Sequence, residues 1–505
     1  MKKKGYISKP QYLKIFADSF FYSIFGFIIS KVVQFIIKVI IARNLSVSNF
    51  GLLNLILSVF STLMVLSTLG IPVGITRFIS YYLAKNNINK INTIISSAFI
   101  IIFPISLLVS LGLYLNSELI SVTLKEESLS IYLKYISLAL PFAVFILSAK
   151  SIISSYLKVR YIFFLNSFEI ISRLFFIFIL ILLGYGMSGV IFGYSFSYFL
   201  TFLFALFLLR KLISIKKIDL SFFRKLFNYS WPISLSDIIT TFSKSTDIIL
   251  ISFFIGSYSI GTYSSSMAIS SQLLLFPQLL LSFFFPIISH LYGSGKNYLK
   301  AYRLISYWLF ILLLPLLLFI FFNGQDLIFL IFGKSYIISN LVLVFLSIGN
   351  FINALIIVAG RQILDMLKYT KENLLLTIIR VITIITFGYV FVPLLGNVGA
   401  SIAFAVSLFI ESIFCLVFIK KRVKIFVFDN LRFLKVFLVF LLPSLTFIVT
   451  NNLFKEYSLI KILINSVLFF TLCFISYLIF LYNGEDKTFL KKILLKLKNN
   501  EADNF

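Results

Sequence analysis

Apolar runs of roughly 20 residues, separated by short polar segments, fill almost the whole chain, and a helix of this length can cross a bilayer. We therefore predict an all-α polytopic membrane protein with fourteen transmembrane helices. Their approximate spans are 18–41, 51–72, 93–115, 131–154, 163–184, 188–210, 231–255, 261–288, 304–323, 337–360, 374–395, 398–419, 435–454 and 458–482.

Lys and Arg residues divide unequally between the alternate polar segments. With the N-terminus inside, the inner segments hold 34 of the 45 basic residues, whereas the outer loops hold five. The five are Arg43, Lys125, Lys334, Lys455 and Lys461. Because cytoplasmic loops of membrane proteins are enriched in Lys and Arg, the distribution predicts a multi-pass protein of the cell (plasma) membrane with both termini cytoplasmic.

The composition agrees with this class. The chain has 505 residues, of which 60% are hydrophobic and 12% charged, too much apolar surface for one soluble core. Its net charge of +27 comes mostly from short loops between apolar runs. We interpret that charge as a topology signal and expect no nucleic-acid partner.

Several kinds of chemistry lack the residues they need. The two cysteines, Cys415 and Cys473, lie inside apolar runs, where we interpret them as packing residues, and His290 is the single histidine, so we expect no metal site. The stretch Gly293–Lys296 fails the phosphate-loop pattern because Asn297 follows the lysine. We therefore expect no cofactor, and a protein that is not an enzyme.

An internal repeat of about 210 residues organises the chain. Leu45–Gly51 is similar to Ile255–Gly261, Gly186–Val190 to Gly396–Ala400, and Arg173 corresponds to Arg380. The offset predicts two parallel six-helix lobes with substrate space between them. We expect an N-lobe at 1–220 with helices 1–6, a C-lobe at 221–433 with helices 7–12, and helices 13–14 with a cytoplasmic tail at 434–505.

Ionisable residues within the apolar runs are the candidate functional residues, because charge at bilayer depth is costly and usually faces a cavity or a partner. Lys31 and Lys38 are seven residues apart on one predicted helix face, as are Asp237 and Lys244. We predict that cations in the cleft bind substrate, and that two acids provide coupling to Na⁺ or H⁺. The cations are Lys31, Lys38, Lys244, Arg77, Arg173 and Arg380, and the acids are Asp237 and Asp247.

Structural roles remain open for several of these residues. Lys38 could extend to the outer interface, and Lys244 could pair with Asp247. Glu169 and Arg173, four residues apart, are typical of an ion pair on one helix, and Arg77 also satisfies the topology rule.

Two further signals concern helix breaks and packing. Pro72, Pro277 and Pro286 interrupt the helices that close the two equivalent hairpins, and they permit bends. Gly70 and Gly74 form a pair of small residues that is typical of close helix packing.

These landmarks together resemble a known family, the polysaccharide transporters or O-antigen flippases of the multidrug/oligosaccharidyl-lipid/polysaccharide (MOP) exporter superfamily. The resemblance is carried by Ala42–Leu45 with Phe50 and Gly51, by Gly70–Arg77, by Asp247 ahead of Ile260–Tyr263, and by Gly396–Ala400. It covers most of the chain. The family's usual glycine after the Arg-x-Leu of the first turn is Ser46 here.

The resemblance implies a monomeric two-lobed carrier that flips a polyprenyl- or dolichyl-diphosphate-linked oligosaccharide to the outer leaflet by alternating access. A cation-coupled multidrug exporter of the same superfamily is an alternative. Alternatives of another class are a membrane glycosyltransferase or polymerase, and a scaffold of an envelope-glycan complex. The excess of cations over acids in the predicted cleft favours an anionic substrate.

Overall fold

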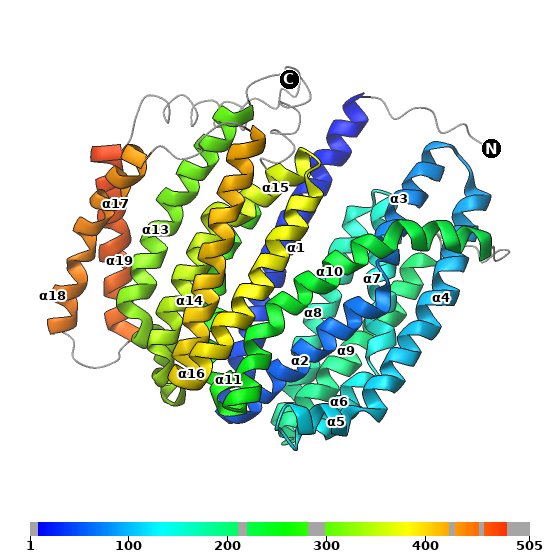
Figure 1. The fold of residues 1–505 in the computed structure, drawn as a ribbon, viewed down its shortest axis with the longest axis horizontal. Helices are drawn as coiled ribbons and strands as arrows, with labels where there is room; N and C mark the ends of the chain where they lie inside the picture. The colour runs from blue at the N-terminus through cyan, green and yellow to red at the C-terminus, as the bar shows by residue number, and fades with distance from the viewer. Residues whose placement is uncertain (1–8, 211–219, 281–297, 424–429, 454–458, 482–505) are drawn as a thin grey trace. The chain divides into compact units, whose positions relative to one another are not determined.

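The computed structural model describes residues 9–210, 220–280, 298–423, 430–453 and 459–481, and these residues are helical with short turns (Figure 1). The α-helices are α1 Lys9–Asn44, α2 Val47–Thr68, α3 Ile71–Ala84, α4 Ile88–Leu115, α5 Ser117–Thr123, α6 Leu129–Ser137, α7 Leu140–Ser155, α8 Val159–Leu182, α9 Gly186–Leu209, α10 Leu220–Phe254, α11 Ser257–Ser270, α13 Tyr298–Ile331, α14 Asn340–Ile352, α15 Val358–Met366, α16 Thr370–Val423, α17 Asn430–Ser444, α18 Thr446–Leu453 and α19 Leu459–Ser476.

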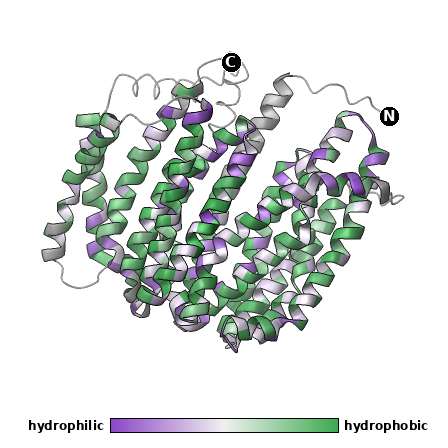
Figure 2. Cartoon of the chain, in the orientation of Figure 1, coloured by the Kyte–Doolittle hydropathy of each residue, from purple (hydrophilic) through white to green (hydrophobic). Residues whose placement is uncertain are grey.

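The helices are built largely of hydrophobic residues, as the green ribbon in Figure 2 shows, and many large apolar side chains are exposed. Large side chains such as Leu115, Leu182 and Leu394 are between 68% and 73% exposed. Surfaces of this kind require a lipid environment. Among the described residues, nine helices are long and apolar enough to cross a membrane, or ten if the bent pair α6–α7 forms one span. The prediction of an all-α polytopic membrane protein is confirmed.

The chain forms two compact units. One comprises Ser19–Ala268 and Leu374–Glu411, and the other comprises Met1–Asp18, Ile269–Asn373 and Ser412–Phe505. The lobe boundaries at residues 220 and 433 stay a prediction. His290, Pro286 and the Gly293–Lys296 stretch lie outside the described residues.

The first hairpin has the turn that the sequence predicts. Helix α1 ends at Asn44, and the Ser46 hydroxyl accepts a hydrogen bond of 3.2 Å from the Asn49 backbone N–H, which caps α2. Helix α2 ends at Thr68, the next two residues Leu69 and Gly70 have positive φ, and α3 then begins with Pro72 in its first turn. Proline suits this place because it needs no backbone hydrogen-bond donor there, so the predicted break is confirmed.

Helix α16 contains two membrane segments. It is 54 residues long, or about 80 Å at 1.5 Å per residue, far more than a bilayer core requires. Gly396 has non-helical angles (φ 61°, ψ −135°), and Gly399 packs against the backbone of Phe391. Residues eight apart meet only where the chain reverses, so the break predicted between 395 and 398 is confirmed.

The last helices differ from the sequence prediction at Lys461, which we placed in an outer loop. Lys461 lies in α19, buried, with its Nζ 3.1 Å from the Asp326 Oδ2 of α13. One turn away in α13, the Oδ1 of Asn323 accepts a hydrogen bond of 2.7 Å from Asn465. The ion pair and the amide hydrogen bond give these buried groups partners across the helix contact, which allows α13 and α19 to keep them within the helices.

The starts of α2 and α11, which are equivalent in the repeat, meet through two glycines. A Cβ added to Gly51 would lie 2.6 Å from the Gly261 backbone nitrogen, and nearer still to the Ser257 carbonyl oxygen. A Cβ added to Gly261 would lie 2.8 Å from Val47 Cγ1. Val47 and Ser257 are themselves repeat equivalents, so the contact is reciprocal, as a local two-fold axis requires.

A second pair of equivalent contacts involves the two arginines of the repeat. The Arg173 guanidinium lies 4.8 Å from the Tyr194 ring centroid, and that of Arg380 lies 5.7 Å from the Phe404 ring. Tyr194 and Phe404 are 210 residues apart. The repeat therefore extends to side-chain contacts as well as turns.

Helix α3 packs closely on α10. A Cβ on Gly70 would come within 2.5 Å of the Ser230 carbonyl oxygen, and a Cβ on Gly74 would overlap the Ser230 hydroxyl. One turn further along α3, the Arg77 guanidinium lies 4.0 Å from the Tyr229 ring centroid. The small-residue pair is therefore a packing surface, as its spacing predicts.

Candidate functional site

A cavity of about 520 Å³ lies between α2, α3, α7 and α10, within the unit formed by Ser19–Ala268 and Leu374–Glu411. Its walls carry six hydroxyl side chains. They are Thr68, Thr76, Ser151, Ser154, Thr240 and Thr241. The break between α2 and α3 contributes Gly70, so the edge of the cavity includes irregular backbone, which membrane proteins tolerate beside a cavity.

Three charged residues line the same cavity. Asp237 and Lys244 project from α10, where their spacing of seven residues places them on one face, and Lys150 projects from α7. Two cations and one acid leave an excess of one positive charge. The cavity therefore offers hydroxyls for neutral polar groups together with cations for an anion.

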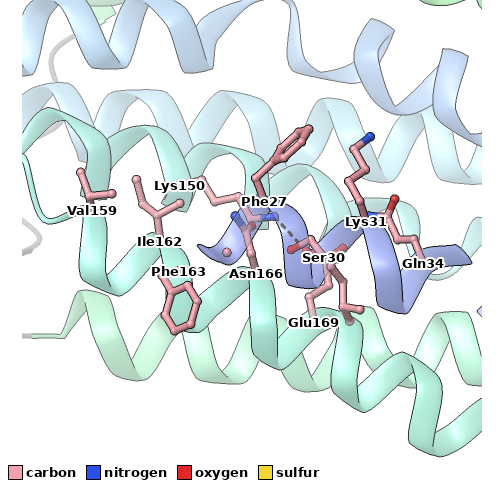
Figure 3. A pocket seen from close by; sticks show the side chains of 12 residues that line it. Phe27, Ser30, Lys31, Gln34, Lys150, Val159, Ile162, Phe163, Asn166 and Glu169 are labelled. Carbon is pink, nitrogen blue, oxygen red and sulfur yellow. Dashed lines mark hydrogen bonds and ion pairs between the residues drawn. The ribbon is translucent and has the colours of Figure 1, made fainter. Parts of the chain in front are cut away.

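A second cavity of about 380 Å³ lies between α1, α7 and α8 (Figure 3). Lys31 and Gln34 of α1 line it, with Asn166 and Glu169 of α8. In Figure 3 the Lys31 ammonium extends away from Glu169, and that ammonium lies 5.5 Å from the Phe27 ring centroid. Its walls are more apolar on the side of Val159, Ile162 and Phe163.

Lys150 lines both cavities and is paired with an acid. Its Nζ lies 2.8 Å from Glu169 Oε2, and the other carboxylate oxygen of Glu169 lies 2.8 Å from the Arg173 guanidinium. Figure 3 shows Lys150 and Glu169 directed toward each other. One carboxylate thus serves two cations, and the predicted Glu169–Arg173 ion pair is confirmed.

Arg173 itself is buried and lines neither of these two cavities. Its Nε donates to the Ser197 hydroxyl at 3.4 Å, and its guanidinium lies between 4.8 and 4.9 Å from the rings of Tyr194 and Tyr198. These contacts hold it between α8 and α9. In this structure Arg173 therefore fixes Glu169 in position.

Asp247 is only 4% exposed and lies away from these two cavities. Its carboxylate accepts hydrogen bonds from the Tyr263 hydroxyl at 2.6 Å and from the Ile248 backbone N–H at 2.9 Å. Arg380 of α16 lies near enough for its charge to act on the same carboxylate. These three side chains join α10, α11 and α16.

The structure thus brings Lys31, Lys244 and Asp237 to cavity walls, while Lys38, Arg77 and Arg380 line neither of the two cavities. The residue that sequence reasoning missed is Lys150. We counted it as an inner-loop lysine because it lies near the end of an apolar run. Glu169, 19 residues later, becomes its partner only through the packing of α7 against α8.

No cluster of three or more His, Cys, Asp and Glu side chains that could hold a metal ion occurs in the part of the chain that the structure describes. The cavity chemistry consists of ammonium groups, a carboxylate and hydroxyls. Such groups bind and orient a ligand by hydrogen bonds and charge.

The all-helical fold, with charged cavities inside apolar helices, defines a polytopic membrane protein. The chain belongs to the polysaccharide biosynthesis protein family, whose model matches residues 16–292. The predicted family resemblance is confirmed. A relative from Haloferax volcanii, the probable low-salt glycan biosynthesis flippase Agl15, is 25% identical over 203 residues, which are 40% of this chain and 43% of the relative. The chain spans about half the length of the curated relatives it matches.

Two solved structures share the fold. The lipid II flippase MurJ in an inward closed conformation superposes with a TM-score of 0.73 at 17% identity, over 90% of this chain and 98% of MurJ. An inward-facing multidrug resistance MATE family transporter of the MOP superfamily gives a TM-score of 0.64 at 15% identity, over 78% of this chain and 94% of the transporter. At sequence identities of 15–17%, these structures show that the fold is shared and no more.

Proposed function

We propose that the protein is a membrane transporter that flips a lipid-diphosphate-linked oligosaccharide from the cytoplasmic to the outer leaflet by alternating access. It performs no covalent chemistry. Its substrate is a glycan on a polyprenyl or dolichyl diphosphate, which stays anchored in the bilayer while its head passes through the protein.

The observation that carries the proposal is the cavity between α2, α3, α7 and α10. Four of the six wall hydroxyls, those of Thr68, Thr76, Thr240 and Thr241, donate their own hydrogens to backbone carbonyls, so their oxygens can accept hydrogen bonds from sugar hydroxyls. The Lys150 and Lys244 ammonium groups suit a diphosphate, because each can donate charge-assisted hydrogen bonds to phosphate oxygens. A cavity built for cationic drugs would need an excess of acids, and this one has the opposite charge.

The relatives support the same assignment. The Haloferax protein and MurJ are both named as flippases, one for glycan biosynthesis and one for lipid II. The MATE likeness favours the multidrug exporter as the second candidate. The flippase and the multidrug exporter differ in the charge of the ligand that the cavity must hold.

The proposal includes the finer topology. Fourteen helices, both termini cytoplasmic and lobes at 1–220 and 221–433 place the Gly51–Gly261 contact at the outer end of the membrane. The packing of Gly70 and Gly74 on Ser230 is then on the inner side of the cavity. A head group could enter when α3 leaves α10, and could leave when α2 separates from α11. The protein acts as a monomer within the bilayer.

Ion coupling is part of the proposal. Asp237 lines the cavity, where Na⁺ or H⁺ could reach it, and Asp247 is the alternative acid within the helices. Transport by an Asp247→Asn protein with unchanged ion dependence would exclude Asp247. The same comparison with Asp237→Asn tests the cavity acid.

The function is tested by reconstitution in liposomes that carry a lipid-linked oligosaccharide in one leaflet, with a membrane-impermeant enzyme reporting the glycan that reaches the other. We expect flipping by the wild type, and a loss of about tenfold or more with Lys244→Ala, since a charge-assisted contact contributes 1.5 kcal/mol or more. Lys134→Ala is the control, because Lys134 pairs with Glu118 on an exposed surface. Efflux of a cationic dye without glycan flipping would refute the proposal in favour of the multidrug exporter.

A further inference from the structure

The two cavities share a wall made by Lys150 and Ile162, which line both. Lys150 is the charged member of that wall. Its side chain is 25% exposed even while it contacts Glu169, so one side of it remains open to the cavities. A ligand in either cavity can therefore reach the ammonium group.

The ion pair that holds Lys150 can open without leaving an unpaired charge behind. Glu169 contacts Lys150 through Oε2 and Arg173 through Oε1, both at 2.8 Å. If Lys150 leaves, the carboxylate keeps Arg173, whose guanidinium is fixed by Ser197 and by two tyrosine rings. A buried charge that loses its only ion-pair partner strongly destabilises the fold. Glu169 avoids this cost because it keeps its contact with Arg173.

We propose that Lys150 is an exchangeable ligand: it rests on Glu169 in the empty protein and transfers to the diphosphate of the incoming lipid-linked substrate. The inference rests on the proposed function and adds a residue and an order of events to it. Glu169 acts as a positioning residue that holds the ammonium on the wall between the cavities. Lys244 of α10, which lines the larger cavity with Lys150, supplies the second cation.

The exchange has a consequence for selectivity. An anion must compete with the Glu169 carboxylate for Lys150, so a ligand with a single weak negative charge gains little from displacing it. A diphosphate carries more charge and can contact Lys150 and Lys244 together. The pair therefore favours diphosphate-linked lipids over lipids with less negative head groups.

The test measures binding of a short-chain prenyl diphosphate to the purified full chain in detergent, with the matching prenyl alcohol as a ligand that lacks the diphosphate. We expect Lys150→Gln to bind the diphosphate about tenfold more weakly, and to bind the alcohol as the wild type does. Inorganic pyrophosphate should bind with the same dependence on Lys150 but less tightly, because it lacks the lipid. Tighter binding of pyrophosphate than of the prenyl diphosphate would overturn the assignment to a lipid-linked ligand.

A double-mutant cycle separates exchange from a simple structural role. Glu169→Gln should tighten diphosphate binding several-fold when Lys150 is present, because the competitor is gone. It should have no effect in the Lys150→Gln background. Equal effects of Glu169→Gln in both backgrounds, or weaker binding with Lys150 present, would overturn the exchange.

Stability gives an independent measurement should Glu169→Gln fail to fold. Lys150→Gln should change the melting temperature no more than the control Lys134→Gln, which breaks the 2.7 Å ion pair with Glu118. A much larger loss would show that Lys150 is a structural partner of Glu169. If the wild type binds neither diphosphate, the proposed function fails; if it binds them and Lys150→Gln binds equally well, the exchange alone fails.

Discussion

The reciprocal glycine contact between α2 and α11 makes a quantitative prediction for Gly51→Ala. An added Cβ would lie 2.6 Å from the Gly261 nitrogen, whereas ordinary contact begins at 3.4 Å, so the two helices must separate by at least 0.8 Å. Overpacking of this kind costs about 1–3 kcal/mol. The obstructing atoms are backbone, which cannot rotate aside, so we expect the upper part of that range.

The control is Gly112→Ala, because Gly112 is also helical but has no other atom within 4 Å of an added Cβ. Alanine favours a helix over glycine by about 1 kcal/mol, so this variant should match or exceed the wild type in stability. Gly261→Ala should behave like Gly51→Ala, since the contact is reciprocal. Thermal unfolding in detergent measures all three.

A second measurement tests whether the contact between α2 and α11 closes the cavity toward the outside of the membrane. If the contact closes the cavity toward the outside, Gly51→Ala should increase the rate at which a membrane-impermeant thiol reagent, added outside, labels Thr240→Cys in the cavity wall. The native cysteines in the structure are buried and give little background. A Gly51→Ala protein as stable as Gly112→Ala, with unchanged labelling, would refute the close packing and its role.

Two further predictions concern pairs in other parts of the chain. Asp326→Asn should destabilise the protein by about 3–5 kcal/mol, because it leaves the Lys461 charge buried, and Asp326→Leu combined with Lys461→Met should recover most of that loss in thermal unfolding. Arg77→Ala should cost about 0.5–1 kcal/mol through the lost contact with Tyr229, and Arg77→Lys should cost less; equal losses in both would argue against the ring contact.

Much of the fold could be predicted from the sequence because membrane helices are recognisable as long, continuous apolar runs. The turn at Ser46, the break before Pro72 and the reversal at Gly396 all follow from local backbone chemistry, and the structure has each. The Glu169–Arg173 pair follows from helical spacing alone. These features depend on residues close together in the sequence.

The features that the sequence did not predict depend on contacts between residues that are far apart in the chain. Lys461 is 135 residues from Asp326, and only their mutual burial explains why a charge can lie inside α19. Lys150 lies near the end of an apolar run, where a basic residue is usually interpreted as a sign of a cytoplasmic loop. Its position in the sequence therefore did not indicate that it lines a cavity. A charged residue near the end of an apolar run therefore has two interpretations, and packing between helices decides between them.

The repeat also shows why the exchangeable lysine belongs to the first copy. At an offset of 210 residues Gly360 corresponds to Lys150, and at the offset of 207 that relates Arg173 to Arg380, Leu376 corresponds to Glu169. The second copy therefore has neither the ammonium nor the carboxylate at these positions. At Gly360 the sulfur of Cys415 packs against the helix where a side chain would otherwise lie. Arg380, the counterpart of Arg173, has the acid of α10 nearby in place of one on its own helix. The duplicated scaffold thus kept the arginine–ring contact in both copies, while the exchangeable lysine occurs in one.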